Sequence, residues 1–379
     1  MVDRSRRNFS KSVSSAGLLA CLPFPAGHAA VTTAKTIRRV TVTGQLLMKH
    51  ALCAEPYDGF TEIVNELRRG EVVSTDLEVA IHTASSGAPT RDSDTLHTTP
   101  AETLVCVEKM GFNLLALANN HAWDLGTTGV LATRAAVTSA GFGNAGSGTD
   151  WQAATAGGQS PRYPDVTLVS MAIGKIRDGA AATAVRAGVN EIRMASPGAL
   201  NVSDVTRNLD AIAKANKDGK CVLVCLHNHE WGDDMQQVPG WTRKFAHQCI
   251  DAGAALFFSH GAPLLKGIEI YRGKPVFHGL GSLVFHTSKA IGFYAPPVWE
   301  SLIAHLTFEG GRLSVLELVP VALNDKGDVP ERHLETRGRP RIARGADATR
   351  ILERFRSLSE DFGARLELRD DRGYLTLQP

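Results

Sequence analysis

Residues 112–126 (FNLLALANNHAWDLG) constrain the chain most, because an apolar run ends there in an amide, an imidazole and a carboxylate. The first seven residues of this segment predict a buried strand, and Asn120, His121 and Asp124 follow it directly. The carboxyl ends of strands are where α/β sheets collect their ligand sites. The segment therefore predicts an α/β fold with a functional site at this strand end.

Two later apolar runs end in the same way. Residues 222–226 run into His227, His229 and Glu230, and residues 255–258 run into Ser259 and His260. Parallel strands present their carboxyl ends at one edge of a sheet. We therefore expect the three polar clusters to form one constellation.

Strand-like and helix-like segments alternate along most of the chain, which favours an α/β fold with parallel strand pairs. The strand-like runs are residues 40–43, 72–75, 114–118, 166–172, 222–226, 255–259 and 276–277. The helix-like runs are residues 60–68, 100–110, 129–140, 203–216 and 241–252.

The chain resembles the CapA family, named for poly-γ-glutamate capsule synthesis, over roughly Arg39 to Leu318. The order and spacing of four segments carry the resemblance: residues 73–78, 118–126, 225–231 and 267–281. It implies the fold of the metallophosphatase (calcineurin-like) superfamily. The expected architecture is a four-layer α/β/β/α sandwich over residues 36–323, followed by a short C-terminal extension over residues 324–379.

The extension begins with a stretch rich in glycine, proline and arginine, residues 324–345. We interpret its arginines as a solvated basic linker, with a clamp for an anionic substrate as the alternative. A short amphipathic helix with Ile351, Phe355 and Leu358 on one face is expected to follow and to dock on the main domain.

The N-terminus predicts export. Arg6 and Arg7 form a twin-arginine signal, an apolar stretch follows, and small residues suit cleavage after Ala29, which gives a signal peptide over residues 1–29. The protein is then periplasmic or extracellular. A lipid anchor at Cys21 and a plain basic tail are the alternatives.

Composition excludes several classes of protein. The formal net charge is +2, and residues 1–29 contribute +3, so the mature chain is near −1 and has no electrostatic footprint for nucleic acid. No integral membrane span is predicted beyond the first thirty residues. The cysteines lack zinc-type spacing, and buried free thiols are the default interpretation, with at most one or two disulfides. No sequence feature assigns an oligomeric state.

The resemblance implies a metal site. In the family, residues equivalent to Glu78 (or Asp76), Asn120, His227 and His260 would hold the second of two metals. Such a mixed nitrogen and oxygen set suits Mn²⁺, Zn²⁺ or Fe²⁺.

The first metal of the family loses its ligands here. Gln45 stands where the family has an aspartate, and Gly261 and Pro263 stand where the family has histidines. We therefore expect one divalent transition metal, with a metal-free relic of the site as the alternative.

Catalysis is assigned to four residues. His121 is the expected general acid or base, and Asp124 is expected to orient it. His229 and Glu230 depart from the family pattern and are expected to add a further acid–base group.

Three functions are compatible with this site. The first is a metal-dependent hydrolase acting on an amide or phosphoester of a peptide-like or anionic polymer, such as a γ-glutamyl chain. The second is a metal-dependent peptide epimerase of the same fold. The third is a non-catalytic subunit that handles capsule polymer.

Overall fold

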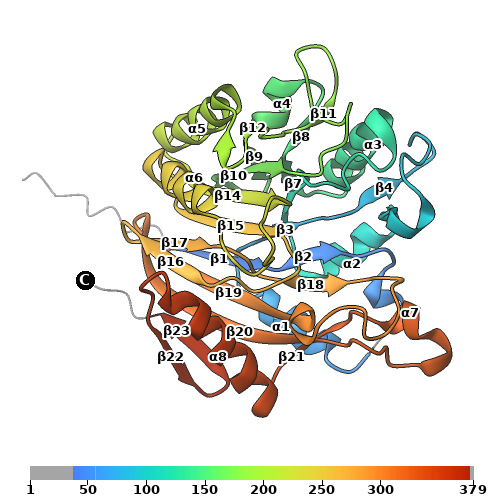
Figure 1. Cartoon of the computed structure of the whole chain (residues 1–379), viewed down its shortest axis with the longest axis vertical. Coiled ribbons are helices and arrows are strands. Elements are labelled where there is room, and N and C mark those ends of the chain that lie inside the picture. Colours follow the sequence, from blue (N-terminus) through green and yellow to red (C-terminus); the bar gives the residue numbers. More distant parts are fainter. Residues whose placement is uncertain (1–36, 56, 376–379) are drawn as a thin grey trace, which may run out of the picture. The chain divides into compact units, whose positions relative to one another are not determined.

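The protein has a mixed α/β fold built on two large sheets, and the computed structural model describes residues 37–375 except residue 56 (Figure 1). All seven predicted strands and all five predicted helices are present. The predicted signal peptide, including Arg6, Arg7 and Cys21, lies outside the described residues.

The larger sheet has nine strands, and its four-strand parallel part carries the first predicted strands. In spatial order the strands are β22 (Leu366–Arg369), β23 (Arg372–Leu375), β20 (Arg312–Leu323), β19 (Glu300–Glu309), β1 (Ile37–Thr43), β3 (Val72–Asp76), β6 (Leu114–Ala116) and β7 (Gly143–Ala145), with β21 (Pro340–Ile342) beside β20. Strands β1, β3, β6 and β7 are parallel, so the residues that follow β3 and β6 emerge at the same edge.

The smaller sheet has six strands. Their order is β16 (Ile268–Tyr271), β17 (Lys274–Phe277), β15 (Leu256–Gly261), β14 (Cys221–Asn228), β10 (Tyr163–Ile173) and β9 (Gly158–Ser160). Strands β10, β14, β15 and β17 are parallel, and the register places His227 beside His260.

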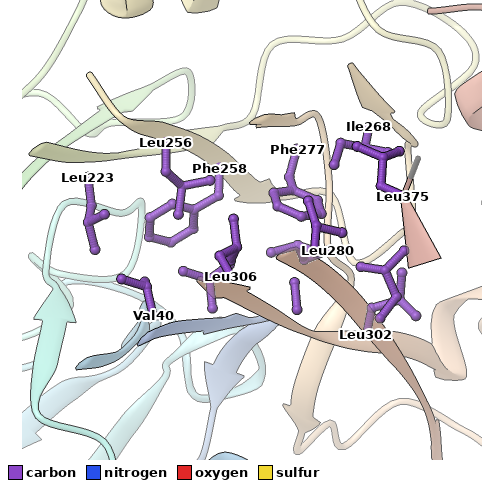
Figure 2. Packing of buried hydrophobic residues seen from close by; sticks show 14 of the residues in the cluster. Val40, Leu223, Leu256, Phe258, Ile268, Phe277, Leu280, Leu302, Leu306 and Leu375 are labelled. Atoms are coloured by element: carbon purple, nitrogen blue, oxygen red, sulfur yellow. The ribbon is translucent and has the colours of Figure 1, made fainter. Parts of the chain in front are cut away.

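A shared apolar core lies between the two sheets (Figure 2). Val40 and Leu306 come from the larger sheet, and Leu223, Leu256 and Phe258 come from the smaller one. All five side chains are at most 1% exposed. Burial of this apolar surface fixes the sheets face to face and so fixes where their strand ends meet.

Helices pack against both sheets. Helices α1 (Phe60–Leu67), α2 (Thr103–Met110) and α3 (Gly126–Ser139) share a core with the larger sheet, while α5 (Val202–Lys217) and α6 (Gly240–Asp251) share one with the smaller. The remaining helices are α4 (Trp151–Thr155), α7 (His333–Thr336) and α8 (Ala346–Glu360). Short strand pairs are β2 (Gln45–Leu47) with β18 (Ser282–Phe285), β4 (Ala80–His82) with β5 (Thr98–Pro100), β8 (Ser147–Gly148) with β11 (Gly188–Val189), and β12 (Met194–Ser196) with β13 (Ala199–Leu200).

The C-terminal segment is part of the main sheet. Strands β21, β22 and β23 extend it, and α8 places Phe355 in the core between the sheets. The interpretation of the arginines as a solvated linker is wrong for two of them, because Arg337 and Arg339 are buried. Their guanidinium groups lie over the rings of Trp299 and Tyr57. Stacking and polar contacts therefore compensate for their loss of water.

We expect Phe355→Ala to lower the free energy of unfolding of the whole chain by about 3–5 kcal/mol, because the fully buried ring leaves a cavity. Chemical denaturation followed by far-UV circular dichroism measures this change. Phe293→Ala is the matched control, since Phe293 is 62% exposed and its loss should change stability by less than about 0.5 kcal/mol. An equally small effect of Phe355→Ala would mean that α8 contributes little to global stability.

No helix among the described residues is long and apolar enough to cross a membrane. Five cysteines among these residues are free; Cys106, Cys225 and Cys249 are buried, as the default interpretation has it, whereas Cys53 and Cys221 are half-buried.

Candidate metal centre

Three strand ends meet in one buried polar site. Asp76 ends β3, Asn120 follows β6, and His227 lies near the end of β14. The first two strands belong to the larger sheet and the third to the smaller, so the site spans the junction of the two sheets. Asp76, Asn120 and His227 are therefore brought together as predicted, whereas the ring of His260 faces the Thr43 carbonyl.

His227 is the centre of the site and is fully buried. Its Nδ1 lies 2.6 Å from Asp76 Oδ2, and its Nε2 lies 2.8 Å from Asn120 Oδ1 and 3.7 Å from Glu78 Oε1. Asn119 in turn donates to Asp76 Oδ1 at 2.9 Å. Asp76 thus holds the Nδ1 side of the ring and leaves Nε2 facing Glu78 and Asn120. A carboxylate behind a histidine is a common way to orient a metal ligand.

Glu78, His227 and His229 form a group suited to a cation. Each offers one ligand atom, and these atoms lie within 4.8 Å of one another. Oε2 of Glu78 and both ring nitrogens of His229 are buried without a hydrogen-bond partner among the described residues. Buried polar atoms normally have partners, and a divalent ion would satisfy all three residues together. The donors therefore fit Mn²⁺, Zn²⁺ or Fe²⁺, with the Asn120 oxygen close by.

The electrostatics of this group also suit a cation. Burial raises the pKa of Glu78 well above its usual value, and the nearby Asp76 and Asp124 raise it further. Burial lowers the pKa of His229, and so does the neighbouring His227, which keeps the imidazole neutral. A neutral imidazole is the form that binds metals, and a cation would stabilise the ionised form of Glu78.

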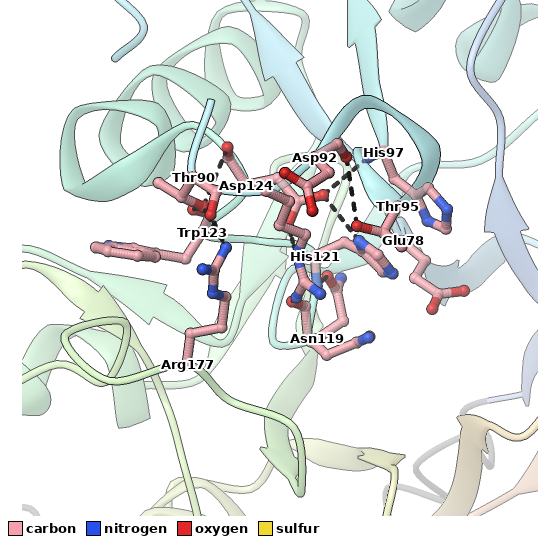
Figure 3. Close-up of polar contacts among 12 residues, drawn as sticks. Glu78, Thr90, Asp92, Thr95, His97, Asn119, His121, Trp123, Asp124 and Arg177 are labelled. Atoms are coloured by element: carbon pink, nitrogen blue, oxygen red, sulfur yellow. Dashed lines mark hydrogen bonds and ion pairs between the residues drawn. The ribbon is translucent and has the colours of Figure 1, made fainter. Parts of the chain in front are cut away.

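His121 lies in a second group that orients its ring (Figure 3). Its Nδ1 lies 2.8 Å from Asp124 Oδ2, so the Nδ1 proton is donated to the carboxylate and Nε2 remains for proton transfer. Arg91 donates to Asp124 Oδ1 and to the Asn120 carbonyl, and the backbone of His97 donates to Asp124 Oδ2. The expected pairing of His121 with Asp124 is thus present.

A second histidine also stacks on one face of the His121 ring. The ring of His97 stacks on it with centroids 3.7 Å apart. Burial lowers the pKa of His121, while the hydrogen bond that His121 donates to Asp124 opposes that shift. The arrangement favours a neutral, oriented imidazole, as a general base requires.

His260 does not join the Glu78 group. Its Nε2 lies 2.8 Å from the Thr43 carbonyl oxygen and its Nδ1 lies 3.6 Å from Cys225 Sγ. Burial lowers the pKa of His260 to about 4, so the neutral ring uses its proton for the carbonyl. Its assignment as a metal ligand stays a prediction that this geometry does not favour.

Gln45 and Gly261, which the resemblance placed at a first metal position, contact each other. The Gly261 backbone donates to Gln45 Oε1 at 2.8 Å. Gly261 has a φ of +108°, and a Cβ there would meet the Asn228 backbone, so a histidine does not fit this conformation. A neutral hydrogen bond therefore stands at this position.

The two remaining catalytic candidates are separated. His229 lies in the Glu78 group, with its ring centroid 5.0 Å from that of His227. The side chain of Glu230 lies against Gly174, and its backbone nitrogen donates to Asn228 Oδ1. His229 is therefore placed as a ligand candidate, and Glu230 is not in contact with His121.

Two residues of the site were absent from the sequence prediction. Arg91 comes from the loop before β5, which carries no motif, and Asn119 precedes the predicted ligand Asn120. Only the position of Asn119 beside Asn120 offered a sequence signal. Arg91 reaches Asp124 across 33 residues of chain, which no local pattern indicates.

Residues 36–287 match the model of a family described as bacterial capsule synthesis protein PGA_cap. The chain belongs to this family. An uncharacterised protein of Sinorhizobium fredii is 25% identical to this chain, over 89% of this chain and 93% of its own.

The alignments with two named relatives cover a smaller share of this chain. A probable polyglutamine synthesis accessory protein of Mycobacterium tuberculosis is 30% identical over 68% of this chain and 65% of its own. The capsule biosynthesis protein CapA of Bacillus anthracis is 25% identical over 72% of this chain and 59% of its own. This chain thus spans less than two thirds of either relative. A crystal structure of a Thermus thermophilus protein matches with a TM-score of 0.37 and 11% identity, covering 73% of this chain and 100% of that one.

Proposed function

We propose that this protein is an exported, metal-dependent hydrolase of the capsule synthesis family that cleaves an amide bond in a γ-glutamyl or related peptide-like polymer. The observation that carries the proposal is the Glu78, His227 and His229 group beside an imidazole that Asp124 orients. Two relatives are named for polyglutamine synthesis and for capsule biosynthesis, which supports the choice of polymer. We also propose the four-layer metallophosphatase-like arrangement as the full architecture.

In this proposal Glu78, His227 and His229 would hold one divalent ion, with the Asn120 amide oxygen close by. The bound ion would supply Lewis acidity toward a substrate oxygen and toward water. Asp76 keeps Nε2 of His227 directed at the site through its contact with Nδ1.

The proton is handled by His121. Its Nδ1–H stays hydrogen-bonded to Asp124, so Nε2 is free to take a proton from the attacking water and return it to the departing amine. Arg91 keeps the Asp124 carboxylate in place, and the stacked ring of His97 shields one face of His121 from water.

Hydrolysis of an amide is favoured over the other candidate functions. The Gln45 contact with Gly261 supports a single metal, and the two-metal clamp used for phosphoesters is then incomplete. An epimerase needs two opposed bases, whereas His229 lies with the ligand candidates and Glu230 lies apart.

The test is direct. We expect purified protein loaded with Mn²⁺, Zn²⁺ or Fe²⁺ to shorten an oligomer of γ-linked glutamate, as followed by mass spectrometry. Treatment with a chelator should abolish cleavage, and adding the metal back should restore it. Incorporation of deuterium at Cα without cleavage would establish the epimerase instead.

Export has its own test. Changing Arg6 and Arg7 to lysine should leave the precursor in the cytoplasm, because the twin-arginine pathway reads that pair. Immunoblots of cytoplasmic and periplasmic fractions measure the distribution. A periplasmic yield equal to that of the unaltered protein would contradict twin-arginine export.

A further inference from the structure

A tryptophan with two lysines lies beside the candidate metal centre. Lys175 follows β10, Trp231 follows β14 and Lys266 follows β15, and these three strands are adjacent and parallel. The two ammonium nitrogens lie 5.3 Å and 5.8 Å from the Trp231 ring centroid. The Trp231 ring is in turn 4.9 Å from the ring of His229. The cations are therefore one aromatic side chain away from the ligand candidates.

Lys266 is an unusual lysine because it is only 5% exposed. Among the described residues it forms no ion pair within 4.0 Å, and attraction to Asp234 opposes only part of the effect of burial on its pKa. Burial lowers the pKa of Lys266 to about 8. Burying a cation without a counter-charge is unfavourable, so a function that uses the charge would explain its retention.

Lys175 is exposed and faces an open hollow of about 680 Å³. The hollow is also lined by Trp123, Arg177 and Asp178. The hollow carries more positive than negative charge, because Lys175 and Arg177 face one acidic residue, Asp178. Lys175 has no ion pair among the described residues. Thr90 also lines the hollow, and its backbone nitrogen donates to the Asp124 carbonyl oxygen at 2.8 Å, so the hollow lies beside the residue that orients His121.

We propose that Lys266 and Lys175, which both lie beside the Trp231 ring, bind free carboxylates of the substrate next to the bond that reacts. Bound carboxylates would give each ammonium group the counter-charge that the described residues do not supply. The choice of a γ-glutamyl chain rests on the proposed function, because such a chain carries one free carboxylate beside each backbone amide.

The test measures binding without turnover. One probe is a trimer of γ-linked glutamate, and the second is the same trimer with its α-carboxylates converted to primary amides. By isothermal titration we expect the full-length protein to bind the acidic trimer at least about 10-fold more tightly, as charge-assisted hydrogen bonds allow. Lys266→Met should weaken the acidic trimer by about 10- to 100-fold and leave the amide trimer unchanged.

Two more variants distinguish loss of the anion site from misfolding of the Lys266→Met protein. Lys175→Met alters an exposed residue and should reduce the same preference, whereas Lys217→Met, on the exposed side of α5, should not. Equal affinities for the two trimers, or an unchanged preference in both Lys266→Met and Lys175→Met, would overturn the proposal. Tighter binding of inorganic phosphate than of the acidic trimer, lost in Lys266→Met, would overturn the choice of carboxylate.

The outcome is separable from that of the proposed function. An acidic trimer that binds with the expected preference but is never cleaved would remove the hydrolase and retain the anion site. Cleavage of both trimers with equal KM would retain the hydrolase and remove the anion site.

Discussion

His121→Ala should lower kcat for cleavage of a γ-glutamyl oligomer by roughly 10²–10⁴-fold, the usual effect of losing a general acid–base group. The reason is specific to the geometry. His121 is the imidazole whose Nδ1 is fixed on Asp124, at 2.8 Å, and whose Nε2 remains available. No other described histidine contacts that carboxylate through its ring.

The metal content of the same variant separates proton transfer from ligation. His121 lies outside the group of ligand atoms, so His121→Ala should bind as much metal as the unaltered protein. His82→Ala serves as the matched control, because His82 is exposed and its loss should change neither rate nor metal. A His121→Ala protein that keeps its rate within a few-fold, or normal capsule output in cells carrying it, would favour the non-catalytic role.

Removing His227 or His229 should empty the metal site, and removing His260 should not. We expect elemental analysis of protein purified without chelator to find about one divalent transition metal per chain, as a single ligand set allows. His227→Ala and His229→Ala each remove one of the three clustered ligands. His260 instead uses its Nε2 proton for the Thr43 carbonyl, so His260→Ala should retain its metal.

The comparison of His229→Ala with His260→Ala decides between two ligand sets. The sequence favoured His260 as a ligand and His229 as an acid–base group. The contacts instead favour His229 as a ligand and place His260 against the Thr43 carbonyl. Loss of metal in His260→Ala with retention in His229→Ala would restore the first assignment. Two tightly bound metals per chain would show that Gln45 does not mark a lost site.

Much of the fold could be predicted because its signals are local. Apolar runs such as residues 222–226 became strands, and the helices between them ended near glycines such as Gly111, whose φ of +103° suits a helix end. The antiparallel pair β19 and β20 is absent from the predicted strands. Its turn, Gly310 and Gly311, has positive φ at both residues, which is the usual signal for a two-residue hairpin.

The arginines of the C-terminal segment show the limit of composition. Charge-rich stretches are usually solvated, and Arg332, Arg341 and Arg344 follow that rule. Arg337 and Arg339 do not, because strand β21 pairs with β20 and carries the adjoining chain across the aromatic side chains. Only pairing between distant segments decides which arginines lose water.

The sequence by itself determined which polar residues follow which strands, and parallel pairing then required those strand ends to lie at common edges. It also determined the nearest pairing, His121 with Asp124, because three residues separate them. The tertiary structure decided the roles. Asp76 meets His227 across 151 residues, and His260 faces the Thr43 carbonyl across 217. Such contacts depend on how two sheets pack face to face, and no local pattern encodes the direction in which each ring then points.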